Sequence, residues 1–138
     1  MRFEKSCGAL IIRKFGGVFK VLLTNGGKDG CWSFPRGEIK EDETEFESVA
    51  RVAGEQYGLN VVLDMDFRYV STYLPRKAVT KDVIYYLAIS DKGEMLPSNN
   101  EAQEAEWVTL QEAASRVIYS GDLALLESAE KYIHIKYK

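Results

Sequence analysis

One stretch, residues 32–59, constrains this 138-residue chain more than any other part of its sequence. Thr44 and Glu47 have the spacing of a capping box, in which the threonine oxygen accepts from the Glu47 amide and the glutamate accepts from the Thr44 amide. Gly58 supplies the left-handed residue that commonly ends a helix. Between them, apolar residues recur at steps of three and four: Phe46, Val49, Ala50, Ala53 and Tyr57. The spacing predicts one amphipathic helix that packs this stripe against a core.

The first half of this stretch is rich in carboxylates, which are Glu38, Glu41, Asp42, Glu43, Glu45 and Glu47. On composition alone, such a run is most often a solvated face. Glu47, Arg51 and Glu55 also lie four residues apart in one helical row, which is typical of an exposed ion-pair ladder. A surface interpretation therefore stands beside any functional one for these residues.

Six residues around the helix keep a longer, fixed spacing. After Gly37, Glu43 follows five intervening residues and Arg51 follows seven more, and Glu55, Gly58 and Leu59 come next. This resembles the Nudix box, whose pattern is G, five residues, E, seven residues, R-E-aliphatic-x-E-E-x-G-aliphatic. The chain departs from the pattern at Val52 and Gln56, where the box has glutamates. In the family these two positions share one helical face and carry the main metal-ligand role.

The resemblance implies a hydrolase of nucleoside diphosphates linked to another group, dependent on a divalent cation. Hydrolysis of a phosphoanhydride needs charge neutralisation and a positioned water, and Mg²⁺ or Mn²⁺ held by several carboxylates supplies both. Because Val52 cannot coordinate and Gln56 would coordinate without charge, weakened metal binding and weakened turnover are expected. The roles implied are metal binding for Gly37 (through its carbonyl), Glu55 and Gln56, phosphate binding for Arg36, catalysis for Arg51 and Glu55, and motif structure for Glu43 and Gly58.

Three further segments are similar to one Nudix subfamily, the asymmetrical diadenosine tetraphosphate hydrolases: CGALIIRK, KDVIYYLAIS and NNEAQEAEWVTLQEA. In that subfamily a loop glutamate six residues before a tryptophan acts as metal ligand or general base. Counting back from Trp107 gives Glu101. The same resemblance implies that Lys81 and Tyr85 face the polyphosphate and the nucleotide. The alternatives are an exposed loop lysine and a half-buried sheet tyrosine.

Composition indicates a compact cytoplasmic protein. A length of 138 residues corresponds to about one domain, here a single Nudix domain over residues 1–138. The net charge of −3 argues against general nucleic-acid binding, and the N-terminal apolar run is too short for a signal peptide or a membrane span. Cys7 and Cys31 cannot form a disulfide framework, so we expect both to be reduced and buried. The expected partner is a small nucleotide, and the oligomeric state stays open.

The remaining sequence alternates strands and turns before two final helices. Strands are expected over residues 3–13, 19–24, 60–74, 82–90 and 106–108, with loops at 25–30, 75–81 and 91–103. A second capping box, Thr109 with Glu112, opens a helix to about Val117. A last helix covers residues 120–134, with an inner stripe of Leu123, Leu126, Ala129 and Ile133. This order predicts an α/β fold, a Nudix-type α/β/α sandwich with a mixed β-sheet.

Other polar groups are less well placed for chemistry. Glu38 is acidic and close to the expected site, whereas His134, the single histidine, is expected on the surface. The glycine-rich loop 25–30 lacks the spacing of a phosphate-binding loop. Three functions remain open: a weakened, metal-dependent hydrolase of nucleoside polyphosphates, a catalytically inactive Nudix-fold domain that binds a nucleotide, and a partner-binding scaffold.

Overall fold

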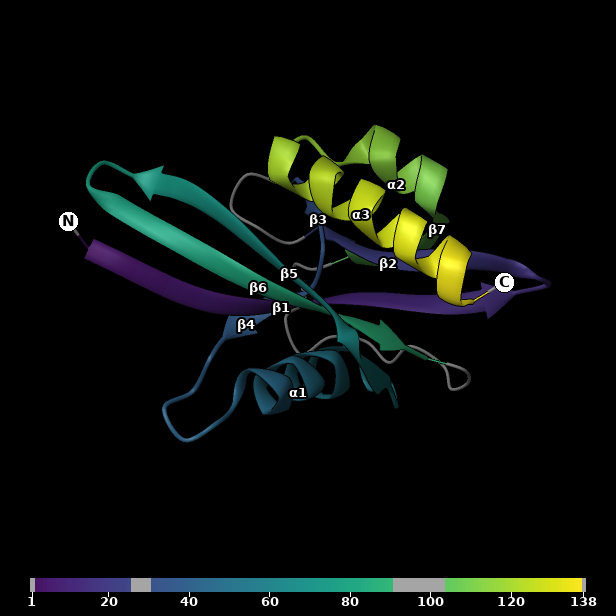
Figure 1. Cartoon of the computed structure of the whole chain (residues 1–138), viewed down its shortest axis with the longest axis horizontal. Helices are drawn as coiled ribbons and strands as arrows, with labels where there is room; N and C mark the ends of the chain where they lie inside the picture. The colour runs from purple at the N-terminus through teal and green to yellow at the C-terminus, as the bar shows by residue number, and fades with distance from the viewer. Residues whose placement is uncertain (1, 26–30, 91–103, 138) are drawn as a thin grey trace.

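The computed structural model of the chain describes residues 2–25, 31–90 and 104–137, which form a sheet with helices on both sides (Figure 1). The elements in chain order are β1 (Arg2–Phe15), β2 (Val18–Asn25), β3 (Trp32–Ser33), β4 (Arg36–Glu38), α1 (Glu45–Tyr57), β5 (Val62–Arg76), β6 (Val79–Ile89), β7 (Glu104–Thr109), α2 (Leu110–Arg116) and α3 (Ser120–Lys136). Of the predicted loop 25–30, Asn25 ends β2 and residues 26–30 lie outside the described residues, as does the predicted loop 91–103 with Glu101.

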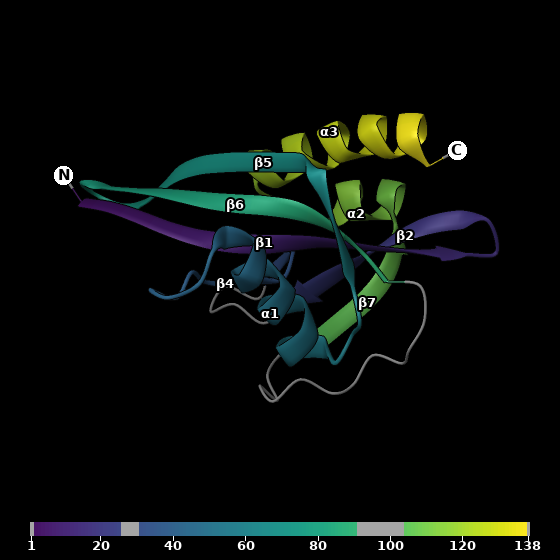
Figure 2. The ribbon, with the colours of Figure 1, turned by 60° about the horizontal axis from the view of Figure 1, so that its bottom comes forward.

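Strand β1 is the centre of a mixed sheet that contains seven strands within the described ranges. It runs parallel to β6 and antiparallel to β2 and β4, while β5 adds to β6 and β7 adds to β2 in antiparallel pairs. The N-terminal part of β1 and the β5–β6 hairpin extend beyond the helices (Figures 1 and 2). Residues of β4 and β6 therefore meet across β1, although they are far apart in sequence.

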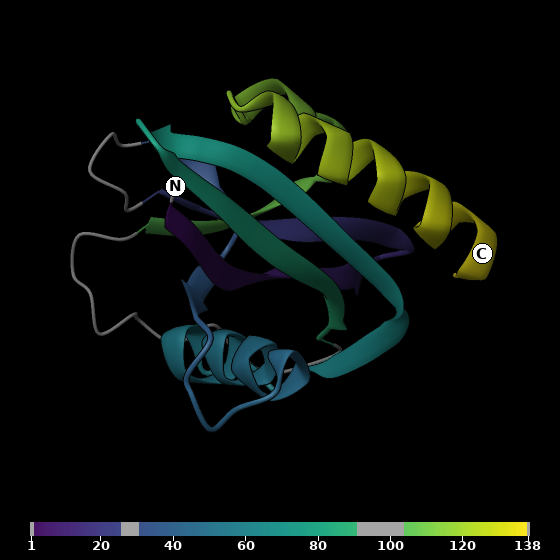
Figure 3. The same cartoon turned by 60° about the vertical axis from the view of Figure 1, so that its left-hand side comes forward.

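The two faces of the sheet carry separate cores. Cys7, Ala9 and Ile11 of β1 pack with α1, whereas Leu10 and Ile12 pack with α3, so the predicted two-sided strand is confirmed. Seen from the side, α1 covers one face while α2 and α3 cover the other (Figure 3). The predicted sandwich with a mixed sheet is therefore confirmed. We call these two sides the α1 face and the α3 face.

Helix α1 begins and ends as predicted, but its buried stripe is rotated. Both hydrogen bonds of the Thr44–Glu47 capping box form, and Gly58 adopts the left-handed conformation with φ of 65°. Phe46, predicted to be inside, is 37% exposed, while Val52 is fully buried beside Val49. Val49, Val52, Ala53 and Tyr57 are also spaced by three or four, so periodicity alone permits either stripe. Packing against β1 selects the one that contains Val52.

Two predictions in the second half of the chain need correction. Lys81 lies inside β6 rather than in a loop, because β5 and β6 extend to a tight turn at residues 77–78. In α3, Leu123 is 39% exposed, whereas Asp122 is 2% exposed and Leu125 is fully buried. The α3 stripe therefore begins at a carboxylate.

Within the described ranges, no helix combines the length and apolar character needed to cross a bilayer.

Candidate functional site

The box residues lie on the α1 face, where β4 meets α1. Arg51 donates through Nε to the Glu43 carboxylate (3.0 Å) and through Nη2 to the Glu38 carbonyl (2.7 Å). The hydrogen bond from Arg51 lowers the pKa of Glu43 below its ordinary value. Arg51 therefore ties the segment before the helix to the helix itself. Both the arginine and the first glutamate of the box are held in a mutual ion pair.

An apolar contact occupies the place where the resemblance implies a metal ligand. Val52 is fully buried in the core that also contains Cys7. The Cys7 thiol donates to the Gly37 carbonyl (3.5 Å), the same oxygen that is expected to hold metal. Burial, opposed in part by the charge of Arg51, raises the pKa of Cys7 to about 11. Among the described residues, the Gly37 carbonyl therefore contacts a neutral thiol, which shares its core with Val52.

The structure describes only part of the donor set expected for a divalent cation. Such ions take several oxygen ligands, of which some are charged. Among the described residues, no group of three or more His, Cys, Asp or Glu side chains is placed to hold a metal. Glu55 and Gln56 belong to α1, but the structure does not describe their side chains, and Glu101 lies outside the described ranges. Glu38 is exposed and meets Arg51 through its carbonyl.

A pocket opens on the α3 face, on the other side of β4 from the box. It encloses about 560 Å³, within the range typical of small-molecule sites. Its walls come from β4, β5, β6 and the segment that starts α3, and they mix polar and apolar groups. The lining residues are Arg36, Ser71, Thr72, Leu74, Val83, Tyr85, Tyr119, Ser120, Gly121 and Asp122.

Arg36 and Tyr85 meet in this pocket over a glycine. In the sheet register, Gly8 of β1 is paired with Arg36 on one side and with Tyr85 on the other. A Cβ atom at Gly8 would lie 2.3 Å from Cε1 of Tyr85, so the ring can cross β1 only because this position has no side chain. Arg36 Nε donates to the Tyr85 hydroxyl oxygen (2.6 Å). Phe34 packs edge-on against the same ring, with centroids 6.1 Å apart.

The guanidinium of Arg36 is also paired with a buried carboxylate. Arg36 Nη2 donates to Oδ1 of Asp122 (2.8 Å), and Ser33 Oγ donates to Oδ2 of Asp122 (2.9 Å). The Asp122 side chain is 3% exposed and the Arg36 side chain 30% exposed. An arginine fixed in this way presents a rigid, permanently charged group to the pocket, a geometry suited to phosphate or carboxylate oxygens.

Part of the pocket mouth is apolar and aromatic, and Thr72 and Ser120 add exposed hydroxyl groups to the lining. Leu74 is 70% exposed and Tyr119 is 44% exposed, and both line the opening. Deeper in, a Cβ atom at Gly121 would lie 2.6 Å from the Ser71 hydroxyl, so the start of α3 packs closely on β5. An apolar rim above a charged floor suits a ligand that has a flat apolar part and an anionic part.

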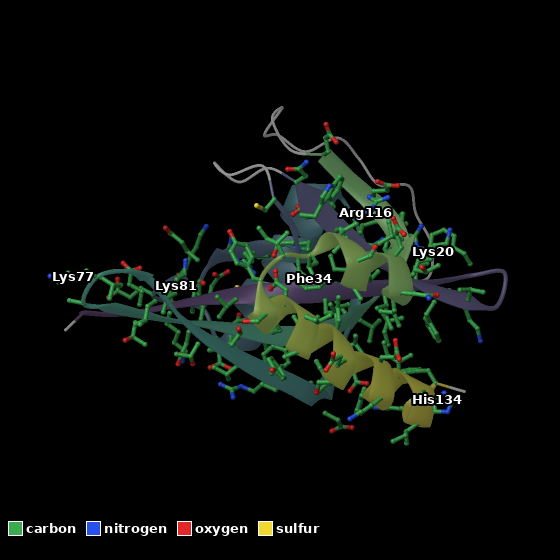
Figure 4. The ribbon with its side chains drawn as sticks, turned by 90° about the horizontal axis from the view of Figure 1, so that it is seen from above. Lys20, Phe34, Lys77, Lys81, Arg116 and His134 are labelled. Carbon is green, nitrogen blue, oxygen red and sulfur yellow. The ribbon has the colours of Figure 1, made fainter. Side chains whose placement is uncertain are left out.

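The structure brings some of the predicted site residues together and separates others. Arg36 and Tyr85 meet in the pocket, and Lys81 precedes Val83 and Tyr85 at alternate positions of β6, on the same face of the sheet. Lys81 and Lys77 lie along the extended β5–β6 hairpin (Figure 4). His134 lies far from them, near the C-terminal end of α3. His134 is exposed, as predicted, and Cys31 is partly exposed rather than buried.

Several pocket residues escaped the sequence interpretation. Asp122 occupies a place in the apolar stripe of α3 with Leu125, Leu126, Ala129 and Ile133, and a charged residue in such a stripe was the available signal. Gly8 interrupts a long apolar strand, which often marks a close approach of another group. No local pattern distinguishes Ser33 or Tyr119, because their roles depend on contacts made after folding.

Comparisons with known proteins agree with this architecture. A mutator protein of Mycobacterium tuberculosis is 29% identical over 94% of this chain and 56% of its own length, so the chain spans about half of that relative. The asymmetrical bis(5'-nucleosyl)-tetraphosphatase of Rattus norvegicus is 27% identical over 94% of this chain and 95% of its own length. The structure of a C. elegans Ap4A hydrolase binary complex shares the fold at 23% identity, with a TM-score of 0.86 over 95% of this chain and 98% of that chain.

A family model ties these likenesses to the box itself. The model of the NUDIX domain matches residues 3–128, which include both the box helix and the pocket on the α3 face. The glycine, glutamate and arginine spacing, the sandwich and this match point the same way, and the chain belongs to the Nudix family.

Proposed function

We propose that this chain binds the nucleoside end of a nucleoside polyphosphate in the α3-face pocket and slowly hydrolyses a phosphoanhydride bond of that ligand. The observation that carries the proposal is the anchored guanidinium of Arg36 at the floor of a pocket with an apolar, aromatic mouth. A nucleoside polyphosphate has a flat base for such a mouth and anionic oxygens for such a floor. The name of the rat relative specifies a bis(5'-nucleosyl) tetraphosphate, and diadenosine tetraphosphate is the representative ligand of that class.

Adjacent residues of β4 link this pocket to the box. Arg36 points to the α3 face, and the next residue, Gly37, turns its carbonyl to Cys7 on the α1 face. A polyphosphate bound at Arg36 would thus need to pass only the edge of β4 to reach the box. Lys81, on the pocket side of β6, is a second cation for the polyphosphate. Arg51 would act mainly by holding the box together, through Glu43 and the Glu38 carbonyl.

The proposal includes weak dependence on Mg²⁺ or Mn²⁺. Hydrolases of this family use divalent metals, and Glu55 and Glu101 remain as carboxylates in the sequence, with Gln56 as a neutral oxygen donor. Each missing charge near a reacting phosphoryl group costs rate, because that charge stabilises the transition state. We therefore expect turnover well below that of an enzyme with a complete box.

A second candidate is nucleotide binding without hydrolysis. The observation that favours it is the burial of Val52 against Cys7, with the Cys7 thiol on the Gly37 carbonyl. Val52 offers no ligand atom to a metal, and a neutral thiol adds no charge beside the Gly37 carbonyl. Under this alternative the pocket is retained and the box serves only to fold the chain.

The test combines calorimetry with product chromatography on the full chain. Diadenosine tetraphosphate is titrated with and without millimolar Mg²⁺ or Mn²⁺, and product is followed over hours. Slow, metal-dependent release of nucleotide products supports the hydrolase, and binding without product supports the second candidate. Failure to bind would contradict both and leave the scaffold function.

A matched pair of variants links binding to the pocket. Arg36→Ala removes the pocket guanidinium and is expected to weaken binding by about 10-fold or more, as loss of a charged hydrogen bond commonly does. Arg68→Ala removes an arginine from the α1 face, where it pairs with Glu45 at 3.0 Å, and should leave affinity unchanged. Equal effects of the two variants would contradict the pocket assignment.

The cellular setting follows from the same proposal. The ligand is a small nucleotide rather than a nucleic acid, because the net charge is −3 and the site is a pocket of about 560 Å³ rather than a basic surface. Cys7 and Cys31 form no disulfide within the described residues, as expected of a chain that works in the cytoplasm. We propose that residues 1–138 form one Nudix domain that carries this activity.

A further inference from the structure

We propose that Asp122 is a positioning residue, which fixes the guanidinium of Arg36 at the pocket floor and thereby sets the affinity for the nucleotide. The link to nucleotide affinity rests on the proposed function. The link between Asp122 and Arg36 stands on the structure alone. Asp122 belongs to the first turn of α3, and Arg36 belongs to β4, so the pair joins elements 86 residues apart.

The burial of Asp122 requires a compensating partner. Its side chain is 3% exposed, and a carboxylate removed from water is stable only when it is paired and hydrogen-bonded. Oδ1 accepts from Arg36 and Oδ2 accepts from Ser33, so each oxygen has a named donor. The two contacts fix the direction of the carboxylate as well as its charge.

Arg36 is held at two nitrogens from two sides. Nε donates to the Tyr85 hydroxyl at 2.6 Å, and Nη2 donates to Asp122 at 2.8 Å. Because a guanidinium is planar, two fixed nitrogens determine the orientation of the whole group. Without Asp122, Arg36 would lose one of the two contacts that fix the plane of its guanidinium. Asp122 therefore converts a long side chain into a fixed part of the pocket.

A close helix contact brings Asp122 within reach. The neighbouring Gly121 packs on Ser71, where a Cβ atom would lie only 2.6 Å from the Ser71 hydroxyl. This contact seats the first turn of α3 directly on β5. The first turn of α3 therefore sets both the distance between the pocket walls and the distance between Asp122 and Arg36.

A second buried aspartate at the other end of α3 provides a matched control. The Asp64 side chain is also 3% exposed, and it accepts from the hydroxyls of Tyr132 (2.8 Å) and Tyr137 (2.6 Å). Lys136 adds an ion pair at 3.0 Å. All three partners belong to the C-terminal part of the chain, outside the pocket lining. Asp64 anchors the helix as Asp122 does, but it holds no pocket residue.

The first experiment needs no nucleotide. The Arg36 Nε–H resonance is followed by ¹⁵N NMR in the wild-type chain, in Asp122→Asn and in Asp64→Asn. The expected result is a distinct, slowly exchanging signal in the wild type and in Asp64→Asn, and its broadening or loss in Asp122→Asn. An unchanged signal in Asp122→Asn would overturn the proposal, whatever the chain binds.

The second experiment measures the dissociation constant for diadenosine tetraphosphate in EDTA. Asp122→Asn should weaken binding at least tenfold, and Asp64→Asn less than twofold. In an Arg36→Ala background, Asp122→Asn should cause no further loss, because Asp122 acts through Arg36. Additive losses in that background would indicate a general structural effect and overturn the proposal. Absence of wild-type binding would contradict the proposed function instead, and the NMR result would still decide the role of Asp122.

A milder variant tests the proposal in case Asp122→Asn does not fold. Ser33→Ala removes the contact to Oδ2 and leaves the Arg36–Asp122 pair in place. It should broaden the Arg36 signal partially and weaken binding by about two- to fivefold, roughly the effect of one modest hydrogen bond. If Asp122→Asn does not fold, an unaltered Arg36 signal and unaltered affinity in Ser33→Ala would overturn the proposal.

Discussion

The α1 face and the α3 face meet at one dipeptide of β4, and they differ sharply there. On the α1 face, the Gly37 carbonyl meets the Cys7 thiol, next to the buried Val52. On the α3 face, Arg36 enters a pocket and is held by Tyr85 and Asp122. The α1 face holds Val52 where the family pattern has a glutamate, whereas the α3 face has a polar site with paired charges. The box residues and the polar pocket therefore lie on different sides of one sheet.

The difference separates the structural role of the motif from the catalytic role that the family resemblance implies. Thr44, Glu47 and Gly58 still cap the helix, and Arg51 still binds Glu43. These contacts stabilise the fold whether or not a metal is bound. Val52 adds apolar burial in place of a carboxylate, which fills the core on this face. Folding and turnover thus make separate demands on the same helix.

The largest expected effect comes from restoring the box. Val52→Glu combined with Gln56→Glu should raise kcat for diadenosine tetraphosphate by about 100-fold in Mg²⁺, the scale on which one transition-state contact commonly acts. The buried site should also make the variant less stable without metal and responsive to it, because metal then binds the folded state alone. Turnover by chromatography and thermal melting with and without Mg²⁺ measure the two effects.

The control for restoration is Val52→Gln with Gln56→Glu, which adds polarity at residue 52 without charge. This variant should lose stability but gain little turnover. If it matches the doubly acidic variant, the gain does not come from a rebuilt metal site. If neither variant changes the rate, other groups already supply the chemistry, and the contrast between the two faces is wrong.

On the α3 face, Gly8→Ala should damage both stability and binding. The new methyl group would lie 2.3 Å from the Tyr85 ring, so the ring must move and release Arg36. Overpacking of this kind costs about 1–3 kcal/mol of unfolding free energy. Urea denaturation and calorimetry with diadenosine tetraphosphate measure the two losses. Wild-type affinity in a folded Gly8→Ala chain would show that the Tyr85 position does not shape the site.

At the far end of α3, Asp64 should make stability depend on acid pH. Burial alone would raise the pKa of this carboxyl, but hydrogen bonds from Tyr137, Tyr132 and Lys136 outweigh burial and lower it from 3.8 to about 2. A depressed pKa stabilises the folded state above pH 4, and that contribution is lost as pH falls through about 2. The wild type should therefore lose about 2 kcal/mol relative to Asp64→Asn between pH 6 and pH 2, by urea denaturation. A gap that does not change with pH would contradict this.

The smallest expected effect is a gain in stability rather than a loss, and it comes from a residue on the α1 face. Gly54 sits inside α1, and a Cβ atom there would meet its nearest neighbour, the Leu59 carbonyl oxygen, at 3.8 Å. Because alanine favours helix over glycine, Gly54→Ala should stabilise the chain by about 0.5–1 kcal/mol without changing nucleotide affinity. Thermal melting checks the gain. A loss of affinity would place the nucleotide site on the box helix and reverse the comparison.

Local signals predicted much of this molecule. The caps of α1 are built from residues three apart or at the helix end, so Thr44, Glu47 and Gly58 could be assigned without the fold. The alternation of β1 likewise predicted a strand covered on both faces. The choice between Phe46 and Val52 for the buried stripe could not be made, because both satisfy the same period and only packing on β1 decides it.

The candidate site was predictable only in part. Arg36 and Tyr85 came from the family resemblance, but their meeting over Gly8 depends on a register between three strands. Asp122 joins them from the last helix, across 86 residues of sequence. Such contacts leave little trace in local periodicity, apart from a charge in an apolar stripe and a glycine in a buried strand. The pocket is a product of tertiary packing.

The most direct test of the account maps the nucleotide on the folded chain. ¹H–¹⁵N spectra are recorded with diadenosine tetraphosphate in EDTA, so that binding is separated from any metal at the box. The account predicts shifts at Arg36, Ser71, Tyr85, Tyr119 and Gly121, which line the α3-face pocket, with little change along α1. Shifts confined to residues 43–57, with a silent pocket, would contradict it.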